Sequence, residues 1–122
     1  MNKSNKEIVL EVLKRAFIDH DPTVVEQLFG ANYKQHNPVI PDGPLAVAGM
    51  IPTLTALAYE PGMAVADGDL VMVHGRYTGW GPKPMIAVDI FRVKDGKVVE
   101  HWDVMQEEVS TASGHGMFTK PE

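Results

Sequence analysis

Short β-rich runs separated by turn dipeptides fill the second half of the sequence, and this pattern restricts the fold more than any other feature. The turns are Asp67-Gly68, Gly79-Trp80-Gly81-Pro82 and Asp95-Gly96, and each separates two runs of apolar and β-branched residues. Strands are predicted at residues 63–66, 70–78, 85–93 and 97–109. Consecutive strands joined by tight turns form an antiparallel meander, because a parallel pair needs a long crossover between its strands.

Helices are predicted ahead of this region. Ser4 and Glu7 form a capping-box pattern directly before apolar residues that recur at helical spacing. A second helix is predicted over residues 22–29, before Gly30, and a third over residues 45–58, broken or kinked at its proline. Helices followed by a meander indicate an α+β fold.

The composition fits one globular domain spanning residues 1–122. Hydrophobic residues make up 44% and charged residues 22% of the 122 residues, which is an ordinary balance. The net charge is −5, and no basic cluster is longer than Lys14-Arg15, so nucleic acid is not an expected partner. The absence of cysteine excludes disulfides, thiolate metal sites and a cysteine nucleophile.

The first seven residues are too polar to lead into a signal peptide, and no later stretch is long and apolar enough to cross a membrane. We therefore expect a cytoplasmic protein without a membrane partner. Phosphate-binding glycine loops and a Gly-x-Ser-x-Gly elbow are also absent. No cofactor is expected.

The register of the last hairpin decides whether Asp89 and Asp103 can cooperate. A two-residue turn at Asp95-Gly96 would place the two aspartates on opposite faces of the sheet. A three-residue loop, Lys94-Asp95-Gly96, would place Asp89 opposite His101 and diagonal to Asp103, all on one face. In that second register both faces of the hairpin are largely apolar, so each should be covered, and a homodimer is plausible.

Acidic groups and an imidazole interrupt one of these apolar faces. Burying such groups costs several kcal/mol unless they are paired or hydrogen-bonded, so their presence requires a compensating interaction. Two nearby carboxyl groups in an apolar cavity suit acid/base chemistry, because one then stays protonated while the other acts as a base. The alternative is that one aspartate is simply paired with His101 or Arg92.

Two segments resemble the SnoaL-like polyketide cyclases. They are residues 87–103, AVDIFRVKDGKVVEHWD, and residues 33–38, YKQHNP. This family belongs to the nuclear-transport-factor-2-like superfamily, with the ketosteroid isomerases, scytalone dehydratase and limonene epoxide hydrolase. The resemblance implies a single SnoaL-like domain with a cone-shaped, curved antiparallel sheet, of the cystatin-like roll type, which encloses a pocket with the N-terminal helices.

The resemblance also implies roles for individual residues. Asp103 lies where similar enzymes carry a catalytic aspartate, Asp89 where they carry a second acid or a histidine, and His36 and Asn37 in a loop near the pocket mouth. The chain does not match the full catalytic set of any one member, and the superfamily includes many binding proteins.

The candidate site combines both lines of reasoning. Candidate catalytic residues are Asp103, Asp89, His36 and His101; candidate substrate-binding residues are Asn37, His74, Tyr33, Phe91 and Met105. His101 could orient an aspartate or simply pair with it, and the alternation of residues around His74 leaves it facing either the cavity or solvent. No local metal-ligand spacing occurs, so no metal site is predicted.

Three functions are compatible with this site. The first is a cofactor-independent enzyme that cyclises by aldol chemistry, or isomerises, a small hydrophobic carbonyl compound, with Asp103 as the base. In it the other acid, or His36, His74 or His101, would hydrogen-bond the enolate oxygen. The second is a non-catalytic module that binds a hydrophobic metabolite, and the third is an epoxide or ester hydrolase.

Overall fold

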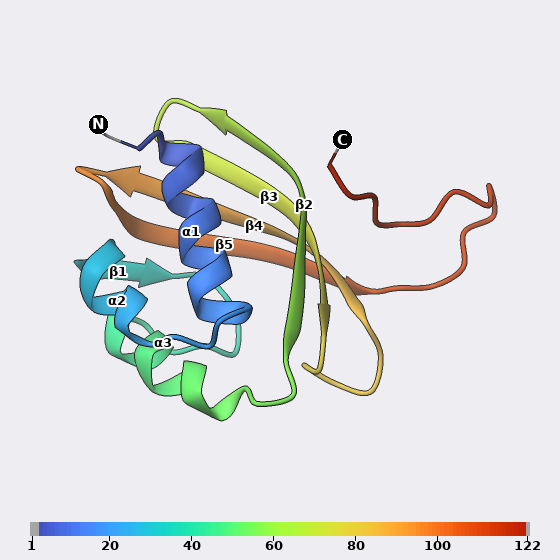
Figure 1. Cartoon of the computed structure of the whole chain (residues 1–122), viewed down its shortest axis with the longest axis horizontal. Coiled ribbons are helices and arrows are strands. Elements are labelled where there is room, and N and C mark those ends of the chain that lie inside the picture. Colours follow the sequence, from blue (N-terminus) through green and yellow to red (C-terminus); the bar gives the residue numbers. More distant parts are fainter. Residues whose placement is uncertain (1–2, 122) are drawn as a thin grey trace.

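The computed structural model describes residues 3–121 and shows one curved five-stranded sheet with helices packed across one of its faces (Figure 1). The chain is α+β. Its elements are α1 (Asn5–Phe17), α2 (Thr23–Leu28), β1 (Phe29–Gln35), α3 (Pro44–Met50), a 3₁₀ turn (Ile51–Thr53), β2 (Ala58–Asp67), β3 (Leu70–Thr78), β4 (Met85–Lys94) and β5 (Lys97–Glu107). No helix within residues 3–121 has the length and apolar character needed to cross a membrane.

The predicted first helix is confirmed. Ser4 accepts a hydrogen bond from the backbone N–H of Glu7, whose side chain accepts one from the backbone of Ser4, so the capping box is complete. The buried stripe of α1 consists of Ile8, Val9, Val12, Leu13 and Ala16. This stripe packs on the face of the sheet that we call the inner face.

The sheet is mixed rather than wholly antiparallel. β2, β3, β4 and β5 form the predicted antiparallel meander, but β1 pairs in parallel with β5 at the sheet's edge. The sequence analysis missed β1. It ended a helix near Gly30, whereas α2 ends at Leu28 and the chain turns directly into a strand. A Cβ on Gly30 would lie 2.9 Å from a methyl carbon of Val99, so glycine permits the close approach of β1 to β5.

The predicted third helix is too long. α3 ends at Met50, and Ile51–Thr53 tighten into a 3₁₀ turn that contains Pro52. Proline has no N–H to continue the α-helical hydrogen bonds, so the helix stops there. The chain is then free to begin β2 at Ala58, five residues before the predicted strand start at residue 63.

A β-bulge sets the register of the β4–β5 hairpin. Asp95 and Gly96 form a two-residue turn with φ of 51° and 77°, and Lys94 pairs with Lys97. Of the two alternatives for this turn, the structure contains the two-residue one. An extra residue, Val99, then shifts the register, so that Arg92 pairs with Glu100, Phe91 with His101 and Asp89 with Asp103.

The bulge turns the later residues of β5 to the other face. Asp89 and Asp103 thus share the inner face, as predicted, but they lie directly opposite each other rather than diagonally. In the ladder of β4 and β5, the residue paired with His101 is Phe91 rather than Asp89.

Candidate functional site

A cavity of about 550 Å³ lies between the inner face of the sheet and the helices. Most of its lining is apolar, with side chains from α1, β1, α3, β4, β5 and the β3–β4 loop. Its polar lining consists of a group near the centre of the sheet, Tyr33, Gln35, Asn37, Tyr77, Asp89, His101 and Asp103, and of Trp80 and Lys83 in the β3–β4 loop and Glu107 at the end of β5. A concave apolar space with a few converging polar groups is the usual form of a small-molecule site.

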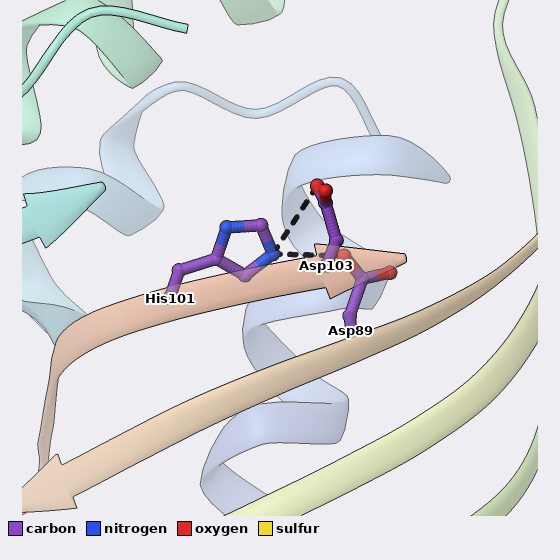
Figure 2. A group of neighbouring side chains, drawn as sticks. All are labelled: Asp89, His101 and Asp103. Atoms are coloured by element: carbon purple, nitrogen blue, oxygen red, sulfur yellow. Dashed lines mark hydrogen bonds and ion pairs between the residues drawn. The ribbon is translucent and has the colours of Figure 1, made fainter. Parts of the chain in front are cut away.

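Asp89, His101 and Asp103 form the centre of the polar group. Figure 2 shows His101 and Asp103 projecting from β5 and Asp89 from β4 toward a common point. The Nε2 atom of His101 lies 2.8 Å from Oδ1 of Asp89 and 3.8 Å from Oδ2 of Asp103. The exposed fractions of these side chains are 7%, 6% and 9%, so the cluster is almost fully withdrawn from water.

Gln35 determines which ring nitrogen of His101 carries a proton. Its side-chain oxygen lies 3.1 Å from the backbone N–H of Asn37, which can only donate, so this atom is the amide oxygen. The same oxygen lies 2.6 Å from Nδ1 of His101. Nδ1 must therefore carry a hydrogen and donate it to Gln35.

This assignment constrains the pair formed by His101 and Asp89. Their 2.8 Å contact between Nε2 and Oδ1 requires one hydrogen between the two atoms, either on an imidazolium or on a protonated carboxyl. The other oxygen of Asp89 accepts a hydrogen bond of 2.8 Å from the hydroxyl of Tyr77. Both oxygens of Asp89 are thus engaged. Burial raises the pKa of Tyr77 well above its usual value, and the charge of Asp89 raises it further, so the phenol stays a donor.

Asp103 is bonded differently. The amide oxygen of Asn37 accepts from the backbone N–H of Val39, which leaves the Asn37 nitrogen to donate to Oδ2 of Asp103 at 2.7 Å. Oδ1 of Asp103 accepts no hydrogen bond from residues 3–121, and the residue lines the cavity. Of the two aspartates, Asp103 is therefore the one with an oxygen available to a ligand.

The predicted substrate-binding residues fall into two groups. Tyr33, Asn37, Phe91 and Met105 line the cavity, together with the predicted Asp89, His101 and Asp103. The ring of Phe91 also contacts the imidazole of His101, with 4.6 Å between their centroids. The structure therefore brings seven of the nine predicted residues together.

His36 does not face the cavity. Residues 33, 35 and 37 point inward, so His36 points to the outer face, where its ring stacks on Trp102 and its Nε2 lies 2.7 Å from Glu100. This hydrogen bond lowers the pKa of Glu100. The sequence prediction grouped His36 with Asn37 as one loop, but neighbouring residues of extended backbone face opposite sides.

His74 also lies on the outer face. Its neighbours Val73 and Gly75 pair with Asp89 and Ala87 on the inner face, and alternation directs His74 away from them. Its ring is stacked against Phe118 of the C-terminal segment, at 6.3 Å between centroids. The prediction of a substrate-binding His74 therefore finds no support in this geometry.

Gln35 and Tyr77 are members of the site that the sequence analysis missed. Both follow from period-two alternation, which was followed in β4, in β5 and around His74 but was not extended to residues 33–37 or to Tyr77. Gln35 alternates with Tyr33 and Asn37, and Tyr77 alternates with the buried valines of β3.

The central cluster is also the set of described residues that could hold a metal ion, since one ligand atom of each residue lies within 4.8 Å of the others. In the observed geometry, however, the hydrogen between His101 and Asp89 occupies the lone pairs that an ion would need.

A protein-family model matches most of the chain. The model of the SnoaL-like domain matches residues 9–101. The chain belongs to the SnoaL-like domain family. The matched segment contains α1 from Val9 onward, the sheet up to His101 in β5, and most of the cavity lining, and it ends two residues before Asp103. No curated protein matches the chain.

Solved structures show that the fold of this SnoaL-like domain is widespread. TsrD from Streptomyces laurentii has a TM-score of 0.71 at 20% identity, over 87% of this chain and 91% of that one. An NTF2-like protein from Cytophaga hutchinsonii has a TM-score of 0.74 at 14% identity, over 87% and 93%. A candidate polyketide cyclase from Acidithiobacillus ferrooxidans has a TM-score of 0.71 at 18% identity, over 87% and 92%. At these identities the likeness concerns the fold.

Proposed function

We propose that this SnoaL-like domain catalyses proton transfer on a small hydrophobic carbonyl compound, in an aldol cyclisation or an isomerisation, without a cofactor. The observation that carries the proposal is the free oxygen of Asp103 in a buried apolar cavity, beside a second carboxyl group and an imidazole that already share a proton. A carboxylate oxygen that no protein donor occupies can accept a proton from a ligand bound in the cavity.

The proposed roles follow from the hydrogen bonds. Asp103 removes a proton from the carbon beside the carbonyl and later returns it, and Asn37 holds the carboxylate in place. Gln35 and Asp89 hydrogen-bond the two ring nitrogens of His101, Gln35 at Nδ1 and Asp89 at Nε2, and so fix the orientation of the ring. His101 in turn lies close enough to Asp103, at 3.8 Å, for a positive imidazole to stabilise the negative carboxylate.

Deuterium exchange tests the proposal without knowledge of the natural substrate. A panel of aryl ketones and 1,3-diketones is incubated with the protein in heavy water, and exchange at the carbon beside the carbonyl is followed by NMR. We expect the wild-type protein to accelerate exchange and Asp103→Asn to lose about 100-fold or more of this rate, the usual contribution of a general base. Asp95→Asn is the matched control, because this exposed aspartate lies in the same hairpin and asparagine accepts its positive φ of 51°.

Other outcomes favour the other functions. If the ketones bind but no exchange occurs, and Asp103→Asn binds them equally well, the binding-module hypothesis replaces the enzyme. Transfer of labelled oxygen from water into an epoxide or ester product would instead indicate hydrolysis. A cytoplasmic location and a homodimer, without nucleic-acid or membrane partners, stay predictions.

A further inference from the structure

Removal of a proton beside a carbonyl group leaves negative charge on the carbonyl oxygen. In an apolar cavity this enolate oxygen needs a hydrogen-bond donor that is already in place, and such a donor is worth several kcal/mol in the transition state. This inference therefore rests on the proposed function, and it asks which group of the chain supplies that donor.

The donors suggested by the sequence are all unsuitable. His36 and His74 lie on the outer face of the sheet. Both nitrogens of His101 are bonded, one to Gln35 and one to Asp89.

Asp89 cannot supply the donor either. Both of its oxygens are engaged, one by the hydroxyl of Tyr77 and one by His101. The hydroxyl hydrogen of Tyr77 is already donated to Asp89 and is not available to a ligand. The acid/base cluster therefore has no donor left over for a ligand.

Tyr33 has the properties that these groups lack. It lines the cavity, and its hydroxyl oxygen accepts a hydrogen bond of 3.3 Å from the side-chain nitrogen of Gln35. The hydrogen of this hydroxyl has no acceptor among residues 3–121, so it is available to a ligand. A donor whose oxygen already accepts a hydrogen bond is also a stronger donor.

The surroundings keep this phenol neutral and fixed. Burial raises the pKa of Tyr33 far above its ordinary value, and the charges of Asp89 and Asp103 raise it further. The hydroxyl is also linked to the acid/base cluster through Gln35, whose side-chain nitrogen donates to Tyr33 and whose oxygen accepts from His101. The ring packs against Phe29 with 4.7 Å between centroids, so only the hydroxyl end meets the polar part of the cavity.

We propose that Tyr33 donates the hydrogen bond to the carbonyl oxygen of the substrate and thereby stabilises the enolate. In the first step Oδ1 of Asp103 takes the proton, the carbon–hydrogen bond breaks, and its electron pair forms the carbon–carbon double bond of the enolate. The carbonyl π pair moves onto the oxygen, which the Tyr33 hydroxyl faces. Return of the proton to a different carbon of a conjugated enolate gives isomerisation. In the aldol, the enolate carbon attacks a second carbonyl, and the alkoxide that forms takes the proton back from Asp103.

The positions of the Tyr33 hydroxyl and of Oδ1 of Asp103 define the class of substrate. The ligand needs a carbonyl group with a hydrogen on the neighbouring carbon, on an otherwise apolar body. The carbonyl oxygen lies toward β1 and the acidic carbon toward β5. Esters and epoxides without such a hydrogen would bind without reacting.

Tyr33→Phe is the test, because it removes only the hydroxyl and keeps the ring packing. Tyr59→Phe is the matched control, since Tyr59 is equally buried, its hydroxyl has no hydrogen-bond partner, and it does not line the cavity. With 2-acetylnaphthalene in heavy water, we expect Tyr33→Phe to lower kcat for exchange about 100-fold with a smaller change in KM. Tyr59→Phe should stay within about threefold of wild type. Wild-type exchange in Tyr33→Phe would overturn the assignment.

A second measurement separates this inference from the proposed function. The carbonyl stretching frequency of bound, ¹³C-labelled 2-acetylnaphthalene reports the hydrogen bond directly, whether or not exchange occurs. We expect a lowered frequency in wild type, in Asp103→Asn and in Tyr59→Phe, and loss of this shift in Tyr33→Phe. If wild type catalyses no exchange, the proposed function fails, while the infrared shift still decides whether Tyr33 is the donor. Equal frequencies in wild type and Tyr33→Phe, or no saturable binding of any aryl ketone, overturn the assignment.

Discussion

All three tyrosines of the chain, Tyr33, Tyr59 and Tyr77, should resist ionisation until the protein unfolds. Each is at most 5% exposed, and burial is the main cause that raises the pKa of each phenol, followed for Tyr59 and Tyr77 by the charge of Asp89. In the unfolded chain the same phenols lose their protons near pH 10. Above that pH the folded state holds more protons than the unfolded state, so the free energy of unfolding falls as the pH rises.

The size of this effect can be worked out from the number of groups. Each phenol contributes about 1.4 kcal/mol per pH unit, so three phenols give about 4 kcal/mol per pH unit above pH 10. A domain with about 6 kcal/mol of stability should therefore unfold near pH 11.5, and stability below pH 10 should be unaffected by these groups. Tyr59→Phe should reduce the slope to about 2.8 kcal/mol per pH unit, since two phenols then remain.

The assay compares two signals in one alkaline titration. Absorbance at 295 nm follows the ionisation of the phenols, and far-ultraviolet circular dichroism follows the sheet. The two curves should coincide in one cooperative step. Ionisation of one or more tyrosines near pH 10 with an unchanged dichroism spectrum would refute the argument, because the phenol concerned would then be in contact with water in the fold.

Three further predictions concern packing and assembly. Gly75→Ala should lower the free energy of unfolding in urea by about 1–3 kcal/mol, because the new Cβ would lie 2.6 Å from the ring of Tyr59. Tyr77→Phe should cost about 1.5–3 kcal/mol in the same assay, since Asp89 would lose a buried donor; a cost below about 0.5 kcal/mol would contradict this. We also propose that the apolar outer face pairs two copies, so light scattering should show a dimer that Val104→Asp, at a residue 69% exposed, dissociates.

The fold was predictable because its main patterns are local. The capping box at Ser4 and the turn dipeptides act over a few residues, and the structure contains each of them. β1 was not predictable by the same means. Its partner in β5 lies about seventy residues further on, and the strand gains its stability from that distant pairing and from the close approach at Gly30.

The site was predictable to the extent that alternation along a strand was followed. The sequence left two turns open, and neither alternative included the bulge at Val99, which puts Asp89 and Asp103 on one face beside a two-residue turn. A bulge depends on the register of the whole hairpin, which the sequence of its turn does not determine. His36 was misplaced because the alternation of a strand was not applied to its loop, whereas for His74 alternation alone left the direction of the side chain open.

The hydrogen bonds of the two aspartates have different implications for function. Both oxygens of Asp89 are satisfied by Tyr77 and His101, so its burial is explained by the fold alone. One oxygen of Asp103 is not satisfied by residues 3–121, although the side chain is only 9% exposed. This oxygen is not among the fully buried atoms without a partner, so it is reached from the cavity. A carboxylate charge held in an apolar cavity nevertheless costs stability, and nothing in the packing of the sheet requires it. Asn at position 103 would keep a polar contact with Asn37 without the charge, so Asp103→Asn should raise the stability of the protein while it lowers the proposed activity. Urea unfolding of this variant measures the first effect, and a loss of stability would indicate that Asp103 serves the fold rather than a ligand.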